Sequence, residues 1–489
     1  MDVRKYSGIK IRDMILSGEV KVEEVVNAYL KRIEETEGKI DALLYINKDQ
    51  ALEIARDMDK NGPDPSKKLW GIPVIIKDVL TTKGIPTTCA SKMLENFIPF
   101  YDAEVVRRIK EQGGIIIAKS NMDEFAMGSS TENSAFKPTK NPWDLDRVPG
   151  GSSGGSAAST AASQSPISIG TDTGGSIRQP AAFCGVIGLK PTYGRVSRFG
   201  LIAYGSSLDQ AGPITRTVKD AALMLSVIAG KDKKDSTSSP NPVPDYLQEM
   251  EKYKDLKSIK IGLPKEYWQQ GLDPDIQKKS EDFFRLLKEL GAELIDISLP
   301  HTKYAVATYY IIVMAEASSN LARYDGVRYG YRTKDAEELI DMYVKTRSEG
   351  FGFEVQRRII LGTYVLSAGY YDAYYKKAAQ VRRLIRQDFL EAFSNCDVIL
   401  TPVSPTLPFK LKEKIHDPLT MYLTDIFTNP LNLSGLPGIS IPVGLGDNLK
   451  LPVGLQFIAP PFREDILFGI ADRVEGELDP LPEPFGLKS

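Results

Sequence analysis

The sequence contains 489 residues, of which 42% are apolar and 26% are charged, so the chain can bury a large core. Its 62 basic and 64 acidic side chains give a net charge of -2, which provides no global attraction to nucleic acid. The sequence has no run of roughly 18 apolar residues and no signal or transit peptide pattern. Its three cysteines are scattered without metal-ligand spacing. We therefore expect a cytoplasmic protein with no membrane span and no metal site.

The first half of the chain predicts alternating strands and helices. Apolar side chains recur at helical spacing over 22–33, which indicates an amphipathic helix. Residues 70–78, WGIPVIIKD, read as a buried strand, 103–112 as a helix, and 114–121, GIIIAKSN, as a second buried strand. Strand, helix and strand in this order indicate a parallel arrangement. Residues 147–163 pass from a Gly/Ser loop into small residues that favour a tightly packed helix.

The second half repeats this pattern after a polar, Pro/Ser-rich segment at 230–244, which we interpret as a surface loop rather than an interdomain linker. Strand, helix and strand recur over 258–300, and residues 352–393 read as mostly helical. Further strands are predicted in the last hundred residues or so. We expect the strands on both sides of the loop to join one large sheet.

Two glycine-rich serine loops are the strongest candidates for catalytic chemistry: GGSSGGS at 150–156 and TDTGGS at 171–176. Both lie among apolar strands and small-residue runs, which disfavours a flexible linker. Glycines beside a serine let the backbone approach a substrate and direct N–H groups toward it. A nucleophile that attacks an amide needs such N–H groups to stabilise the oxyanion.

A serine nucleophile also needs a base, and the chain has only two histidines, His301 and His416. Residues 150–154 fit the G-x-S-x-G nucleophile elbow of α/β-hydrolases, which would make Ser152 the nucleophile and a histidine its base. Neither histidine lies in a recognisable catalytic loop. We interpret both as surface or packing residues, and the elbow stays open as an alternative.

A neutral lysine is the other possible base. Lys77 ends the apolar run PVIIK, where its side chain is expected to be buried. Bringing a lysine pKa near 7 requires roughly 4–5 kcal/mol of destabilised charge, which burial can supply. The simpler role for Lys77 is an ion pair with the adjacent Asp78.

Three ordered motifs resemble those of the amidase signature family: Lys-Asp at 77–78, GGSSGGSAA at 150–158 and GTDTGGSIRQPA at 170–181. The spacing between them matches the family as well. The resemblance covers most of the chain, with a signature core at about 69–217. It implies an α/β fold with a single large mixed β-sheet flanked by helices on both faces, and one amidase domain over residues 1–489.

The resemblance also implies a role for each motif. Lys77 would be the base, Ser152 would lie on a cis peptide bond and relay a proton, and Ser176 would be the nucleophile. The oxyanion hole would consist of backbone N–H groups at three positions: Thr173, Gly174 and Gly175.

Four further segments, at 121–136, 190–210, 316–330 and 417–444, resemble one branch of the family, the glutaminase subunits of tRNA-dependent amidotransferases. This branch hydrolyses glutamine to glutamate and ammonia. The ammonia passes to the partner subunits, B and C of a heterotrimer, which amidate mischarged Glu-tRNA(Gln) and in some cases Asp-tRNA(Asn). The sequence has no Walker A motif, so we expect ATP and Mg²⁺ to bind a partner subunit, with no cofactor here. The tRNA is expected to be bound mainly by the partner.

Two other functions stay open at this point: a free-standing amidase for another small amide, and a scaffold or tRNA-binding module without catalysis. The glutaminase resemblance implies contacts to glutamine that would distinguish a glutaminase from either of these alternatives. Arg358 would hold the glutamine α-carboxylate and Asp425 the α-ammonium. Tyr309 and a residue near Ser129 would line the pocket. The simpler interpretations are a solvated helix face for Arg358 and a helix cap for Asp425.

Overall fold

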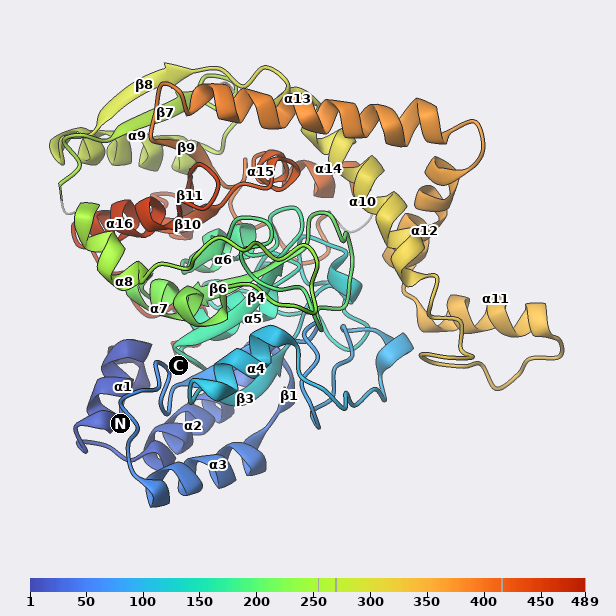
Figure 1. Cartoon of the computed structure of the whole chain (residues 1–489), viewed down its shortest axis with the longest axis horizontal. Coiled ribbons are helices and arrows are strands. Elements are labelled where there is room, and N and C mark those ends of the chain that lie inside the picture. The colour runs from blue at the N-terminus through green and yellow to red at the C-terminus, as the bar shows by residue number, and fades with distance from the viewer. Residues whose placement is uncertain (254, 269–270, 415–416, 489) are drawn as a thin grey trace.

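The computed structural model describes residues 1–253, 255–268, 271–414 and 417–488. Among these residues, 11 strands form one sheet through the centre of the molecule, in the order β1-β3-β2-β4-β6-β5-β10-β11-β9-β7-β8 (Figure 1). The strands are β1 (Leu43–Ile46), β2 (Pro73–Lys77), β3 (Ile115–Ser120), β4 (Ile167–Asp172), β5 (Ile187–Lys190), β6 (Gln210–Thr215), β7 (Lys260–Pro264), β8 (Glu293–Ile297), β9 (Val398–Pro402), β10 (Gly438–Leu445) and β11 (Pro452–Ile458).

Helices cover both faces of this sheet (Figure 1). The α-helices are α1 (Gly8–Leu16), α2 (Val22–Ile40), α3 (Lys48–Asn61), α4 (Glu104–Glu111), α5 (Gly154–Ala161), α6 (Arg178–Cys184), α7 (Val218–Ile228), α8 (Tyr246–Glu249), α9 (Pro274–Glu289), α10 (Ala305–Leu321), α11 (Leu339–Gly350), α12 (Phe353–Leu366), α13 (Lys377–Ala392), α14 (Pro418–Leu423), α15 (Asn429–Ser434) and α16 (Glu464–Glu475). Short 3-10 turns are η1 (Val3–Lys5), η2 (Lys92–Leu94), η3 (Glu124–Ala126), η4 (Met250–Tyr253), η5 (Thr302–Tyr304) and η7 (Phe485–Leu487), and η6 (Tyr371–Lys376) is a π-helix.

The sheet is mixed. β2 pairs in parallel with β3 and β4, and β7 pairs in parallel with β8 and β9, whereas the other pairs are antiparallel. Residues 230–244, all of them described, form no helix and no strand, and strands from both sides of this segment join the sheet. The predicted fold class is therefore confirmed, including the parallel pairing of the first two buried strands.

Burial explains the local structure around the glycine-rich serine loops. Every residue of β2 is buried, as expected for an apolar strand covered on both faces. Helix α5 consists of small residues because its backbone packs closely on its neighbours. A β-carbon at Gly155 would lie 2.4 Å from the Asn121 carbonyl oxygen and 2.5 Å from that of Ala42. Larger side chains would push α5, and Ser152 before it, away from the sheet.

The two ends of the chain lie on the same side of the molecule, where Arg4 and Glu483 form an ion pair at 2.8 Å. At the opposite end, α10, α12 and α13 form a helical layer from which α11 projects (Figure 1). None of the helices in the described ranges is long and apolar enough to cross a membrane.

Candidate active site

The three predicted catalytic motifs meet at the carboxyl ends of β2 and β4. Lys77 is the last residue of β2, and Ser176 follows β4 in the loop that leads into α6. Ser152 immediately precedes the turn into α5. Because β2 and β4 are adjacent and parallel, their carboxyl ends lie at the same edge of the sheet, where α/β proteins commonly place their sites.

Lys77 is hydrogen-bonded to the serines of the first loop. Its fully buried Nζ donates to Ser152 Oγ and to Ser153 Oγ, each at 2.8 Å. Burial lowers the pKa of Lys77 to about 7, against the opposing effect of the carboxylates of Asp123 and Asp172. A lysine with this pKa is largely neutral at slightly alkaline pH, so it can accept a proton from a hydroxyl group.

A backbone hydrogen bond places Ser176 next to the first serine loop, which contacts Lys77. The Ser153 N–H donates to the Ser176 carbonyl oxygen at 3.2 Å. Ser152 follows a cis peptide bond from Gly151, as the family resemblance implied. Ser152 is fully buried, whereas Ser176 is 9% exposed. The hydroxyl that a substrate can approach is therefore that of Ser176, which disfavours the nucleophile-elbow interpretation.

The loop after β4 is held in place by Asp172. This carboxylate accepts a hydrogen bond from the Gly175 N–H at 2.8 Å and forms a buried ion pair with Arg178 at 3.1 Å. The Gly175 N–H is therefore occupied. Within the described ranges, the N–H groups of Thr173, Gly174 and Ser176 make no hydrogen bond, so these three are the free donors in this loop.

Three of the predicted substrate-binding residues surround this loop. The Ser129 hydroxyl donates to Asp425 Oδ2, while Asp425 Oδ1 has no hydrogen-bond partner among the described residues. Burial raises the pKa of Asp425 to about 7. A β-carbon at Gly174 would lie 2.5 Å from the hydroxyl oxygen of Tyr309, so this ring packs directly on the loop and requires glycine there.

Arg358 is buried, and it does not lie on a solvated helix face. Its Nε forms an ion pair with Glu354 at 2.7 Å, and its Nη1 donates to the Tyr204 hydroxyl. The guanidinium carbon lies 5.4 Å from the ring centroids of Tyr310 and Tyr422. A buried guanidinium within an aromatic cage is suited to bind a carboxylate, and Glu354 is its counter-ion in the structure.

A family model described as Amidase matches residues 24–468. The chain belongs to the amidase family. The A subunit of glutamyl-tRNA(Gln) amidotransferase from Nitratidesulfovibrio vulgaris (strain DP4) is 58% identical over 478 residues, which are 98% of each chain. The crystal structure of the corresponding A subunit from Thermotoga maritima is 43% identical, with a TM-score of 0.84 over 100% of this chain and 99% of that chain. The peptide amidase from Stenotrophomonas maltophilia is 27% identical, with a TM-score of 0.81 over 98% of each chain.

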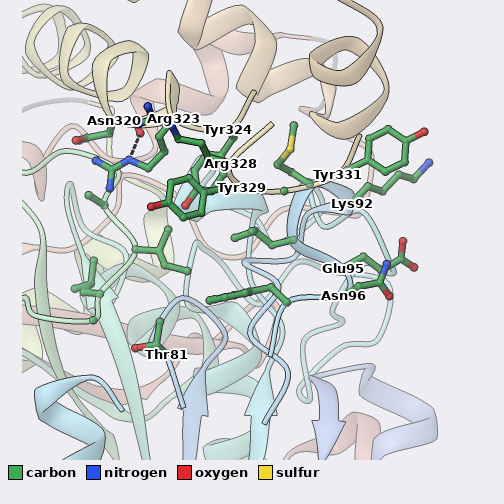
Figure 2. Close-up of a pocket in the computed structure, with 18 of the residues that line it drawn as sticks. Thr81, Lys92, Glu95, Asn96, Asn320, Arg323, Tyr324, Arg328, Tyr329 and Tyr331 are labelled. Atoms are coloured by element: carbon green, nitrogen blue, oxygen red, sulfur yellow. Dashed lines mark hydrogen bonds between the residues drawn. The ribbon is translucent and has the colours of Figure 1, made fainter. Parts of the chain in front are cut away.

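A cavity of about 670 Å³ lies outside this amidase site. It opens between the segment around Lys92 and Glu95 and the segment around Arg323 and Tyr329 (Figure 2). None of the predicted site residues is among the described residues that line it.

Sequence reasoning missed Asn429 at this site. Its side chain is fully buried, and both of its polar atoms lack a hydrogen-bond partner among the residues described. A β-carbon at Gly174 would lie 2.7 Å from Asn429 Oδ1, so the unpartnered amide faces the loop that precedes Ser176. The signal was present, because Asn429 lies four residues after Asp425 in a segment that resembled the glutaminase branch.

We expect a double variant of this amidase, His301→Ala with His416→Ala, to retain most of its activity. The His301 Nδ1 contacts Asp388 Oδ1 on α13 at 2.8 Å, which is a structural pairing, and His416 lies outside the described residues. Steady-state kcat/KM on glutamine provides the measurement, with the melting temperature as a check on folding. A loss of several orders of magnitude at unchanged stability would contradict a lysine-based mechanism.

Arg358→Ala is expected to weaken turnover of glutamine much more than turnover of a neutral amide that lacks the α-carboxylate. Truncating one partner of a buried charge contact costs about 2–4 kcal/mol. The measurement is the ratio of kcat/KM for the two substrates, with Arg358→Lys as a variant that keeps the charge but lacks the planar fork. Equal losses on both substrates would show that Arg358 has a structural role only.

Proposed function

We propose that this chain is the glutaminase subunit of a tRNA-dependent amidotransferase. The observation that carries the proposal is the buried 2.8 Å contact between Lys77 Nζ and Ser152 Oγ, with Ser176 beside it. This arrangement supplies a base, a relay and a nucleophile for amide cleavage. The similarity to the A subunit of glutamyl-tRNA(Gln) amidotransferase along almost the whole chain supports glutamine as the amide.

In the proposed reaction, neutral Lys77 accepts the Ser152 proton while Ser152 accepts the proton of Ser176. The Ser176 oxygen attacks the side-chain amide carbon of glutamine, and the free N–H groups of Thr173, Gly174 and Ser176 stabilise the oxyanion. The predicted third donor, the Gly175 N–H, is hydrogen-bonded to Asp172 instead. The C–N bond then breaks, and the proton returns through Ser152 to the departing ammonia. Water hydrolyses the acyl-enzyme by the same proton route and releases glutamate.

Charge complementarity supports glutamine recognition by the same site. The α-carboxylate would bind the Arg358 guanidinium, and the α-ammonium would bind Asp425, whose free Oδ1 lacks a partner among the described residues. An arriving cation favours the charged form of a carboxyl group, so the raised pKa of Asp425 would fall when glutamine binds. The Ser129 hydroxyl and the Tyr309 ring would complete the pocket.

The ammonia would then be used on another chain. We propose that subunits B and C bind this chain, that ATP and Mg²⁺ bind to a partner, and that the mischarged tRNA is held mainly there. The absence of a Walker A motif from the sequence supports this division. We also propose a cytoplasmic location, which suits three free and buried cysteines.

The test follows labelled amide nitrogen from glutamine into aminoacyl-tRNA. The isolated chain is expected to release ammonia slowly. Adding the partner subunits with ATP and mischarged tRNA should raise the rate of glutamine hydrolysis and transfer the label to the tRNA. Fast hydrolysis of many small amides by the chain alone, with no effect of the partners, would instead identify a free-standing amidase.

A further inference from the structure

A further cavity, of about 430 Å³, is lined by α13, the carboxyl end of α15 and two loop segments, 192–193 and 461–462. Three arginines of α13 line it: Arg382, Arg383 and Arg386. Helices α13 and α15 pack against each other, with α13 running along the top of Figure 1 and α15 beneath it. The cavity is separate from the catalytic loop. Thr428, which caps the amino end of α15, donates to the Gly174 carbonyl oxygen, whereas the cavity lies at the carboxyl end.

In the described part of the chain, no carboxylate lies in the wall of this cavity or pairs directly with its arginines. No aspartate or glutamate is found among the described residues that line it, and none of the three arginines forms an ion pair within the described ranges. Glu316 acts on Arg382 from beyond ion-pair distance. No carboxylate forms an ion pair with Arg383 or Arg386 in the described ranges, and adjacent guanidinium groups repel one another, so this cluster favours an anionic ligand.

The guanidinium groups are placed to bind such a ligand. Arg382 donates to the Leu433 carbonyl oxygen at 2.9 Å, the Ser207 hydroxyl at 2.8 Å and the Ser207 carbonyl oxygen at 3.0 Å. Arg386 donates to the Ser434 carbonyl oxygen. These contacts fix both side chains and leave N–H donors of each unused. Arg383 is exposed and has no hydrogen-bond partner in the described part of the chain. Planar guanidinium forks match the oxygen geometry of a phosphate group.

Two aromatic rings form another part of the cavity wall. Tyr193 and Phe462 line the cavity, and each ring makes a cation–π contact with an arginine. The Arg198 guanidinium carbon lies 5.7 Å from the Tyr193 ring centroid, and that of Arg195 lies 4.8 Å from the Phe462 ring centroid. The volume exceeds what a phosphate group alone fills and falls in the range of small-ligand sites. Basic groups beside aromatic rings are the combination that binds nucleotide units.

We propose that this cavity binds a nucleoside phosphate, with the phosphate on Arg382, Arg383 and Arg386 and the base or ribose toward Tyr193 and Phe462. This chemistry occurs in a free nucleotide and in a unit of RNA. The site is independent of the proposed glutaminase function, because neither glutamine nor the catalytic serines take part.

The test measures binding to the full-length chain in the absence of glutamine. The probes are AMP, inorganic pyrophosphate and a fluorescein-labelled single-stranded RNA dodecamer, titrated at two salt concentrations. Arg383→Glu is expected to weaken binding by about tenfold or more, because it reverses one charge in the cluster. Arg383→Lys should retain most of the affinity. Arg332→Glu, which makes the same charge change at a position outside the cavity, should alter binding by less than about twofold.

The three probes distinguish the source of the ligand. A loss confined to AMP and pyrophosphate identifies a free nucleotide, and a loss confined to the dodecamer identifies RNA. Either result supports the site. If no probe binds the unaltered chain, or if Arg383→Glu and Arg332→Glu weaken every probe equally, the proposal is overturned. A failure of the glutamine test leaves these binding results unchanged, so the two proposals are judged separately.

Discussion

Replacing Ser176 with alanine is expected to reduce ammonia release from glutamine by about four orders of magnitude or more, because loss of a nucleophile removes the covalent route. The side chain makes no hydrogen bond within the described residues, so the free energy of unfolding should change by less than about 1 kcal/mol. Ammonia release by the purified variant, together with its melting temperature, provides the measurement. Glutamine binding should persist, since the proposed carboxylate and ammonium contacts are intact.

Two further serine variants make this result specific. Ser226→Ala removes a hydroxyl that donates to the Ala222 carbonyl oxygen in α7, away from the site, and should leave the rate unchanged. Ser152→Ala should also lose activity, because the relay between Lys77 and Ser176 is broken. Near-normal turnover by Ser176→Ala, with loss only in Ser152→Ala, would favour the nucleophile elbow over the proposed mechanism.

The strands that support the site could be predicted because they are buried on both faces. The runs PVIIK and GIIIAKSN are continuously apolar over most of β2 and β3, and the small residues of α5 indicated close packing. The strand order could not be predicted. β10 pairs with β5 and β11, and the first of these pairings joins Gly438 to Lys190, which lie far apart in the sequence. No local pattern in the sequence specifies such a contact.

The candidate site shows the same division between local motifs and tertiary contacts. Spacing and resemblance were sufficient to select Lys77, Ser152 and Ser176, which the structure brings together. Sequence could not show that the Gly175 N–H donates to a side chain, nor that Asn429 has no partner among the described residues. Both facts depend on how segments from distant parts of the chain pack on the loop after β4.

The protonation state of Lys77 depends on a balance between burial and nearby carboxylates. Burial destabilises its charged form, while Asp123, Asp172 and Asp209 stabilise that form, and the result is a pKa of about 7. The neighbouring buried pair of Lys119 and Asp78, at 3.1 Å, removes the simpler role that the sequence offered for Lys77. Asp78 already has a lysine partner, so Lys77 is left to contact the serines.

This balance predicts that kcat/KM rises with pH through about 7 and then levels, because only neutral Lys77 can accept a proton and its neutral fraction grows as pH increases. Lys77→Arg and Lys77→Met should both reduce kcat/KM by about three orders of magnitude or more, since one stays protonated and the other has no base. Asp425 has a pKa of about 7 and also deprotonates as pH rises. The pH profile of kcat/KM is therefore repeated with the Asp425→Asn variant. Its kcat/KM should be lower at every pH, but the rise should still occur at the same pH. If kcat/KM of that variant no longer rises with pH, the group that titrates in the unaltered chain is Asp425, and the profile does not report Lys77.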